Sequence, residues 1–197
     1  MPPKVIRTNN KTCHVGLEWA AGPPRGIGTL RVAAVPGVTG RGRLCAGGVW
    51  VACALGPGGV SNRKREGDGT TPAGRFKLKY LFFRSDKAPR PATAIRVRAT
   101  RPRDLWCDDP GHRLYNRRTV LPAAARHENL WRADDVYDIV IVLDFNLRQR
   151  VLGRGSAVFF HLARPGFTPT AGCVAITRAD MRRLLPRLSS NCVMIIR

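Results

Sequence analysis

The residues from 136 to 143 (Val-Tyr-Asp-Ile-Val-Ile-Val-Leu) form an apolar run that is broken only near its start. Runs of this length, rich in β-branched side chains, are typical of strands that are buried on both faces. Such a strand needs neighbours within a sheet and cover above and below that sheet. We therefore predict a sheet in which this strand lies near the centre.

Other segments also have the period of strands. Residues 76–80 and 95–98 alternate apolar with basic side chains, which indicates half-buried strands. Residues 44–55 are apolar, but Gly47 and Gly48 divide them into two short strands. Two further strands are expected, at residues 30–35 and 193–196.

A helix is expected late in the chain. Thr177 is a candidate N-terminal cap because Asp180 follows three residues later. Apolar residues then recur with helical spacing, and Pro186 limits the length of the helix. The fold class is therefore mostly β, a mixed β-sandwich or partly closed barrel with one C-terminal helix. Residues 1–28, which are rich in Pro and Gly, are expected to form an N-terminal arm.

The charge of the chain is extreme. Lys and Arg number 34 against 13 Asp and Glu, a net charge of +21, which implies a polyanionic neighbour. The basic residues are scattered along the whole chain without a clustered stripe, and no nucleic-acid-binding motif is visible. A GC-rich genome that favours arginine codons would produce the same excess. The charge alone therefore does not identify the partner.

The six cysteines are widely spread and include no C-x-x-C pair, so their spacing predicts neither a disulfide framework nor a zinc site. No cofactor or metal is expected. No stretch is apolar for long enough to span a membrane. The N-terminal residues lack the apolar region of a standard signal peptide, so none is visible.

Two reactive side chains, His161 and Cys173, each lie beside a short apolar run typical of a buried strand. A thiol becomes a useful nucleophile when a base lies within hydrogen-bond reach, and a histidine can be that base. Gly172 lacks a Cβ, so successive backbone N–H groups can point at one spot and hold an oxyanion. The alternative is that Cys173 is a small apolar core residue and His161 a core histidine.

Three segments resemble one family. Residues 170–174 (Thr-Ala-Gly-Cys-Val) are similar to the Ser/Thr-His-Gly-Cys-hydrophobic signature of YkuD-type L,D-transpeptidases, in which a histidine at a strand end precedes the cysteine. Residues 67–76 resemble the Gly-Asp-x-x-Thr-Pro-x-Gly-x-Phe segment of that family, and residues 137–146 give a third match. Two positions depart from the family pattern. Ala171 replaces the usual histidine, and Ala175 replaces a frequent arginine.

The resemblance implies a catalytic domain over residues 29–197. In it, Cys173 is the nucleophile and His161 the base, oriented by a backbone carbonyl near Leu162 because no Asp or Asn is an obvious third member. The backbone N–H groups of Ala171, Gly172 and Cys173 are expected to form the oxyanion hole. Nothing in this reaction requires a cofactor.

The implied activity is L,D-transpeptidation. The enzyme would form peptidoglycan cross-links of the 3-3 or 1-3 type through a cysteine thioester, and so serve cell wall biogenesis and cell shape. The implied partner is the anionic stem peptide, and the implied location is the periplasm or the cell wall. We expect a monomer that does not bind nucleic acid. Three alternatives stay open: a hydrolase (L,D-carboxypeptidase or endopeptidase) on the same peptides, a wall-binding domain without activity, and a non-catalytic basic nucleic-acid-binding module.

Residues 100–135 form a long polar connection with several aromatic side chains, which is typical of a functional excursion or lid. Arg126 and His127 in this segment are candidates for substrate binding, as are Tyr137 and Thr170 outside it. Residues 84–91 are expected to be a solvated surface loop.

Overall fold

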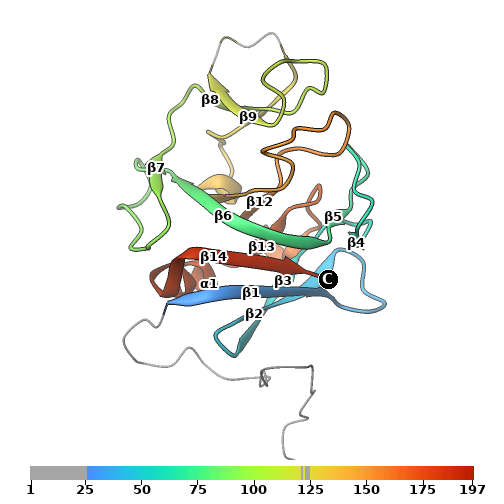
Figure 1. The fold of residues 1–197 in the computed structure, drawn as a ribbon. Helices are drawn as coiled ribbons and strands as arrows, with labels where there is room; N and C mark the ends of the chain where they lie inside the picture. Colours follow the sequence, from blue (N-terminus) through green and yellow to red (C-terminus); the bar gives the residue numbers. More distant parts are fainter. Residues whose placement is uncertain (1–25, 121, 123–124) are drawn as a thin grey trace, which may run out of the picture.

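The computed structural model describes residues 26–120, 122 and 125–197, and a ring of eight strands is its main element (Figure 1). The strands follow one another around the ring in the order β11 (Ile139–Leu143), β12 (Phe159–Leu162), β13 (Val174–Ile176), β3 (Val49–Ala54), β2 (Arg41–Ala46), β1 (Ile27–Ala34), β14 (Leu188–Ile196) and β6 (Gly74–Phe83). Pairing of β11 with β6 closes the ring, and β7 (Val97–Ala99) extends it beside β6. The pairs β1–β14, β12–β13 and β6–β7 are parallel and the others antiparallel. The prediction of a mostly β fold with a mixed sheet is confirmed, and the barrel is closed rather than partly open.

The main core fills the barrel. Its side chains come from alternate positions of the ring strands, such as Leu30, Val32, Phe160 and Leu162. The helix α1 (Arg178–Leu184) is the one α-helix of the described residues, and it packs its apolar face onto this core. Thr177 caps α1 as predicted, because its Oγ1 accepts a hydrogen bond from the Asp180 N–H at 3.1 Å. A short 3-10 helix, η3 (Leu185–Arg187), then leads into β14.

A second sheet lies at one end of the molecule, beyond β6 and β12 (Figure 1). It consists of β8 (Asp104–Cys107) between β10 (His127–Asn129) and β9 (Arg117–Val120). Trp106 on β8 is buried, and its ring packs edge-on against Phe159 on β12 with centroids 5.2 Å apart. The long connection over residues 100–135 therefore contains a small sheet that covers the outer face of the barrel. A second buried cluster lies between the two sheets.

Three expectations need correction. The run 136–143 begins in a 3-10 helix, η1 (Asp135–Tyr137), and strand β11 starts only at Ile139. The loop 84–91 is not wholly solvated, because Arg84 is buried and its guanidinium lies 3.7 Å from the ring centroid of Trp131. Strand β1 begins at Ile27, so the last two residues of the expected arm belong to the barrel; residues 1–25 lie outside the described part of the chain.

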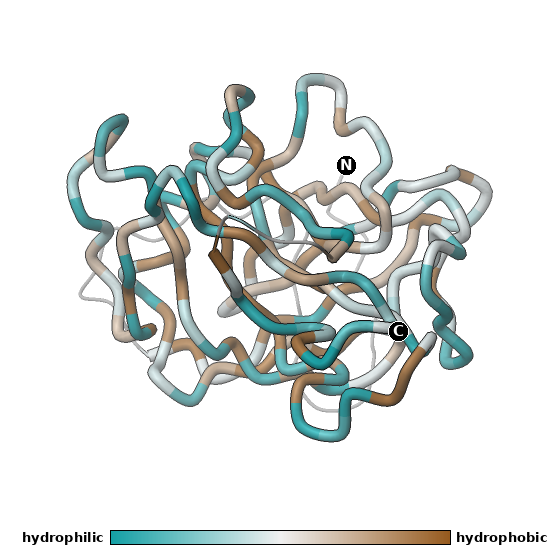
Figure 2. The backbone as a smooth tube through the Cα atoms, turned by 90° about the horizontal axis from the view of Figure 1, so that it is seen from above, coloured by the Kyte–Doolittle hydropathy of each residue, from teal (hydrophilic) through white to brown (hydrophobic). Residues whose placement is uncertain are grey.

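Short elements complete the fold. The polar segment 56–74 contains the paired strands β4 (Val60–Ser61) and β5 (Thr71–Pro72), and η2 (Pro165–Phe167) is a 3-10 turn after β12. Figure 2 shows the apolar stretches running through the middle of the molecule, with hydrophilic loops at its periphery. No helix in the described ranges is both long and apolar enough to cross a lipid bilayer.

Candidate active site

Strands β12 and β13 bring the two reactive side chains together. They pair in parallel, with Phe160 opposite Val174 and His161 opposite Ala175. Since side chains alternate between the faces of a strand, His161 points to the same face as Cys173, away from the barrel core. Cys173 precedes β13, so it is the diagonal neighbour of His161 across the two strands. Ala175, on the same face, also lines the cavity described below.

Both residues line a cavity of about 480 Å³ between the barrel and the small sheet. Its walls come from five parts of the chain that are far apart in sequence. They are the segment 64–67, the small sheet and its flanks, the turn η1, residues 156–161 and residues 164–175. Its charged side chains are Lys64, Glu66, Asp108, Arg126, Glu128, Arg132 and Arg164.

The thiol of Cys173 is held in the neutral form. The residue is 7% exposed, and its Sγ accepts a hydrogen bond from the Phe159 N–H at 3.3 Å. The thiol in turn donates to the Ala157 carbonyl, also at 3.3 Å. Burial raises the pKa of Cys173 to about 12, although the Phe159 N–H opposes this change. A base would have to remove this proton before the sulfur could act as a nucleophile.

His161 has the geometry of such a base. Its Nδ1 lies 2.9 Å from the Leu162 carbonyl oxygen, which can only accept, so Nδ1 carries the hydrogen. The orienting carbonyl predicted near Leu162 is therefore present, and Nε2 is left as the proton acceptor. Burial, with smaller contributions from Arg164 and Arg132, lowers the pKa of His161 to about 4, although the hydrogen bond to Leu162 opposes this change. Near neutral pH the resting pair is thus a thiol and an uncharged imidazole, not an ion pair.

The loop before the nucleophile depends on Gly172. Its φ is 127°, and a Cβ there would lie 2.5 Å from the carbonyl oxygen of Thr70. The Gly172 N–H donates to Thr170 Oγ1 at 3.1 Å, and that hydroxyl donates to the Cys173 carbonyl at 2.7 Å. Thr170 therefore shapes the loop, besides lining the cavity with Ala171. The Gly172 N–H is engaged in this structure, so the oxyanion role predicted for it requires this bond to open.

The candidate substrate-binding residues divide into two groups. Tyr137 and Arg126 line the cavity: the Tyr137 ring packs edge-on against His161 with centroids 5.3 Å apart, and Arg126 forms an ion pair with Asp108. Burial raises the pKa of Tyr137 well above its usual range. His127 is not part of this cavity. It lines a separate one with Cys107, and its Nδ1 lies 2.8 Å from the Ala125 carbonyl oxygen.

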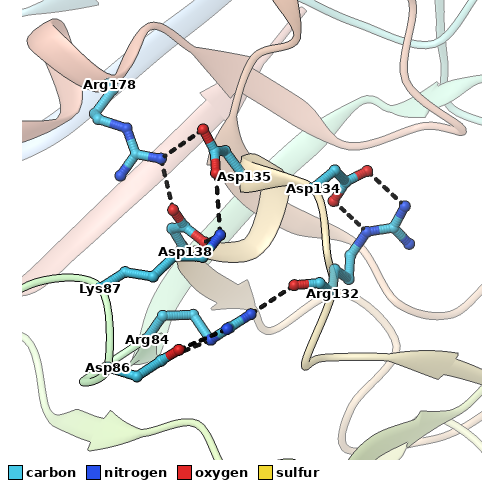
Figure 3. Close-up of polar contacts among 8 residues, drawn as sticks. All are labelled: Arg84, Asp86, Lys87, Arg132, Asp134, Asp135, Asp138 and Arg178. Atoms are coloured by element: carbon cyan, nitrogen blue, oxygen red, sulfur yellow. Dashed lines mark hydrogen bonds and ion pairs between the residues drawn. The ribbon is translucent and has the colours of Figure 1, made fainter.

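Ion pairs fix η1, which carries Tyr137 (Figure 3). Arg132 contacts both carboxylate oxygens of Asp134, at 2.7 and 2.8 Å, and its guanidinium lies 5.3 Å from the Tyr137 ring centroid. On the other side, the buried carboxylate of Asp138 accepts from Lys87 at 2.9 Å and from Arg178 at 2.6 Å. These contacts hold the tyrosine ring against His161.

The sequence pattern gives no signal for four charged residues of the cavity. Lys64, Glu66, Glu128 and Arg164 belong to segments that become neighbours only in the folded chain. Of the four, Glu66 links three segments, because its Oε2 accepts from Ser156 Oγ at 2.9 Å and from the Tyr115 hydroxyl at 2.6 Å.

One of three comparisons with known proteins assigns the chain to a family. A model of the YkuD family, described as the L,D-transpeptidase catalytic domain, matches residues 37–196. Searches of curated proteins and of solved structures found no match. The family match covers nearly the whole chain, including both reactive residues and the segment 67–76. The chain therefore belongs to the YkuD family of L,D-transpeptidase catalytic domains.

Proposed function

We propose that this protein is a cysteine-dependent L,D-transpeptidase that cross-links peptidoglycan stem peptides through a thioester on Cys173. The observation that carries the proposal is the orientation of His161. Its Nδ1 is tied to the Leu162 carbonyl, so Nε2 is free to take a proton within the cavity that also holds the thiol. The family match supports the same class of reaction.

The first half-reaction follows from these two residues. His161 Nε2 takes the thiol proton, and the sulfur attacks the carbonyl carbon at the L-centre of the donor peptide. The C–N bond to the following D-residue then breaks, and the leaving amine takes the proton from the imidazolium. A thioester between the donor peptide and Cys173 remains. Because the resting pair is neutral, proton transfer and attack are coupled.

The second half-reaction decides between transferase and hydrolase. The amine of an acceptor stem gives a proton to His161 and attacks the thioester carbonyl. The C–S bond breaks, and the imidazolium returns the proton to the sulfur. Water in place of the amine would give a carboxypeptidase or endopeptidase, with the same residues in the same roles.

The charge of the cavity suits a stem peptide, which carries both carboxylates and an ammonium group. The guanidinium groups of Arg126, Arg132 and Arg164 lie in the same cavity as the carboxylates of Glu66 and Glu128. Such mixed charge recognises a zwitterionic chain better than a uniformly anionic polymer. We propose that the protein acts as a monomer in the periplasm or the cell wall, where this substrate is found.

The test is incubation of the purified protein with muropeptides, with the wild type compared with Cys173→Ala and the products identified by mass. A cross-linked dimer formed only by the wild type supports the transpeptidase. A trimmed monomer formed only by the wild type replaces it with the hydrolase. Absence of any product in both samples contradicts both activities.

A further inference from the structure

Lys64 is a buried cation that the reaction scheme above does not use. Its side chain is 6% exposed, although it carries an ammonium group. The aliphatic part of the Lys64 side chain passes close to two glycines. Its Cγ lies 3.2 Å from where a Cβ on Gly155 would be, and its Nζ lies 3.3 Å from where a Cβ on Gly172 would be. The ammonium group therefore lies against the residue directly before the nucleophile, in the wall of the same cavity.

The partner of Lys64 is itself shared among several donors. Lys64 Nζ donates to Asp68 Oδ1 at 2.5 Å. The same carboxylate accepts from the N–H groups of Arg65 and Thr70, at 2.7 and 2.8 Å, and from the Thr70 hydroxyl at 2.9 Å. Burial opposes ionisation of Asp68, but these hydrogen bonds together hold its pKa well below the usual range. Asp68 is thus ionised and places Lys64, but its charge is divided between four donors.

The ammonium retains donors for a bound group. An ammonium has three N–H groups, and in the part of the chain that the structure describes Asp68 is the acceptor found for Nζ. Such a donor would assist the reaction, because the Gly172 N–H, one of the three expected oxyanion donors, is already bonded to Thr170. Negative charge develops first on the sulfur and then on the oxygen of the attacked carbonyl. A preorganised cation in a largely buried site stabilises both more strongly than it would in water.

We propose that Lys64 is a further catalytic residue, whose ammonium group stabilises the negative charge on Cys173 and on the oxygen of the attacked carbonyl. This inference rests on the proposed thiol chemistry. In this proposal the segment 67–76 has a positioning role, because its residue Asp68 fixes the position of Lys64. The charged and titratable groups that line the cavity around Cys173 are His161 on β12, Tyr137 on η1, Glu128 on β10, the flanking Arg126, Arg132, Arg164, Glu66 and Asp108, and Lys64.

The first test measures the thiol and does not depend on the substrate. Alkylation of Cys173 by iodoacetamide is followed against pH, with the modified peptide quantified by mass spectrometry. Lys64→Met keeps the aliphatic part of the side chain but removes its charge. The alkylation rate at a fixed pH near 8 should then fall about tenfold, which is the effect of raising the thiol pKa by one unit on the thiolate fraction. Asp68→Asn removes the counter-charge, so the rate should rise. Lys79→Met, which removes an exposed lysine of β6, should leave the rate unchanged.

The opposite signs separate an electrostatic role from a structural one. A purely structural Lys64–Asp68 pair would make both variants change in the same direction, and that result overturns the proposal. An unchanged rate in Lys64→Met, or a wild-type Cys173 that is not alkylated at all, overturns it as well. Thermal melts identify a variant that fails to fold. If Lys64→Met does not fold, the sign of Asp68→Asn decides alone.

The second test separates this inference from the proposed function. With muropeptides as substrate, Lys64→Met should lower kcat about a hundredfold, the effect of one oxyanion donor, while KM changes little. If the wild type makes no product but alkylation follows the expected signs, the substrate assignment fails and the role of Lys64 at the thiol stands. If product forms but neither alkylation nor kcat responds to Lys64→Met, the inference about Lys64 is wrong and the transpeptidase stands.

Discussion

Replacing Gly172 by alanine tests whether the loop before the nucleophile is packed as described. At φ 127° an alanine is strained by about 1–3 kcal/mol. The new Cβ would also lie 2.5 Å from the Thr70 carbonyl oxygen, so the backbone must move, at a further cost of about 1–3 kcal/mol. We expect Gly172→Ala to lower the free energy of unfolding by about 4 kcal/mol. For a chain of this size that corresponds to a melting temperature lower by about 10 °C.

A second glycine, Gly153, provides a comparison in which the steric contact is absent. Gly153 also has a positive φ, 72°, but a Cβ there would have no neighbouring atom within 4 Å in the described structure. Gly153→Ala should therefore cost only the backbone strain, about 1 kcal/mol. Urea unfolding followed by circular dichroism measures both variants. If Gly172→Ala is no less stable than Gly153→Ala, the tight approach of Thr70 to Gly172 is wrong, and so is the placement of Lys64 beside it.

Three further predictions concern His161, the ion pairs of Asp138, and His127, which does not line the cavity of Cys173. The pKa of His161 is lowered from 6.5 to about 4, so the unfolded chain binds a proton that the folded chain does not, and stability should fall by about 3 kcal/mol as pH decreases from 7 to 4. Asp138→Asn leaves Lys87 and Arg178 without their buried carboxylate and should lower the free energy of unfolding by about 3 kcal/mol, measured in urea. His127→Ala should leave the rate of muropeptide turnover unchanged, because that side chain faces another cavity.

Each of these has a matched comparison. His161→Gln should remove its own part of the pH dependence of stability, and an unaltered pH profile would contradict a buried neutral imidazole. Asp135→Asn removes a carboxylate that is 73% exposed and pairs with the same Lys87 and Arg178, so it should lower the free energy of unfolding far less than Asp138→Asn does. Equal losses in the two Asp→Asn variants would show that burial of Asp138 does not matter. Arg126→Ala, at a residue that does line the cavity, is the comparison for His127→Ala.

The strands were predictable because their signal is local. Alternation at residues 76–80, the two glycines within 44–55 and the cap at Thr177 each depend on a few neighbouring residues, and all three features are present. The small sheet was not predictable in this way, because β9 and β10 are short and polar. Their pairing with β8 is stabilised by the packing of Trp106 against the barrel, which only the folded chain reveals.

The distinction between local and non-local signals also explains which residues of the candidate site could be predicted from the sequence. The motif around Cys173 indicates the candidate nucleophile, and the apolar run before His161 indicates the candidate base, since both signals depend on local sequence. Which residue of the 127–128 pair lines the cavity depends on the orientation of β10, because successive side chains of a strand point to opposite faces. Glu128 therefore lines the cavity and His127 does not, although the sequence gives no reason to prefer one over the other.

The departure at Ala175 has a structural counterpart. This residue lies opposite His161 in the register of β12 and β13, where a long arginine would place its charge beside the imidazole. Here the position is occupied by a small, buried alanine. The positive charges that lower the pKa of His161 come instead from Arg132 and Arg164, on two other segments. Since Asp134 contacts both guanidinium groups, at 2.7 and 3.3 Å, one carboxylate fixes the positions of both cations. The charge at the base is thus set by contacts between segments rather than by a residue of the cysteine motif.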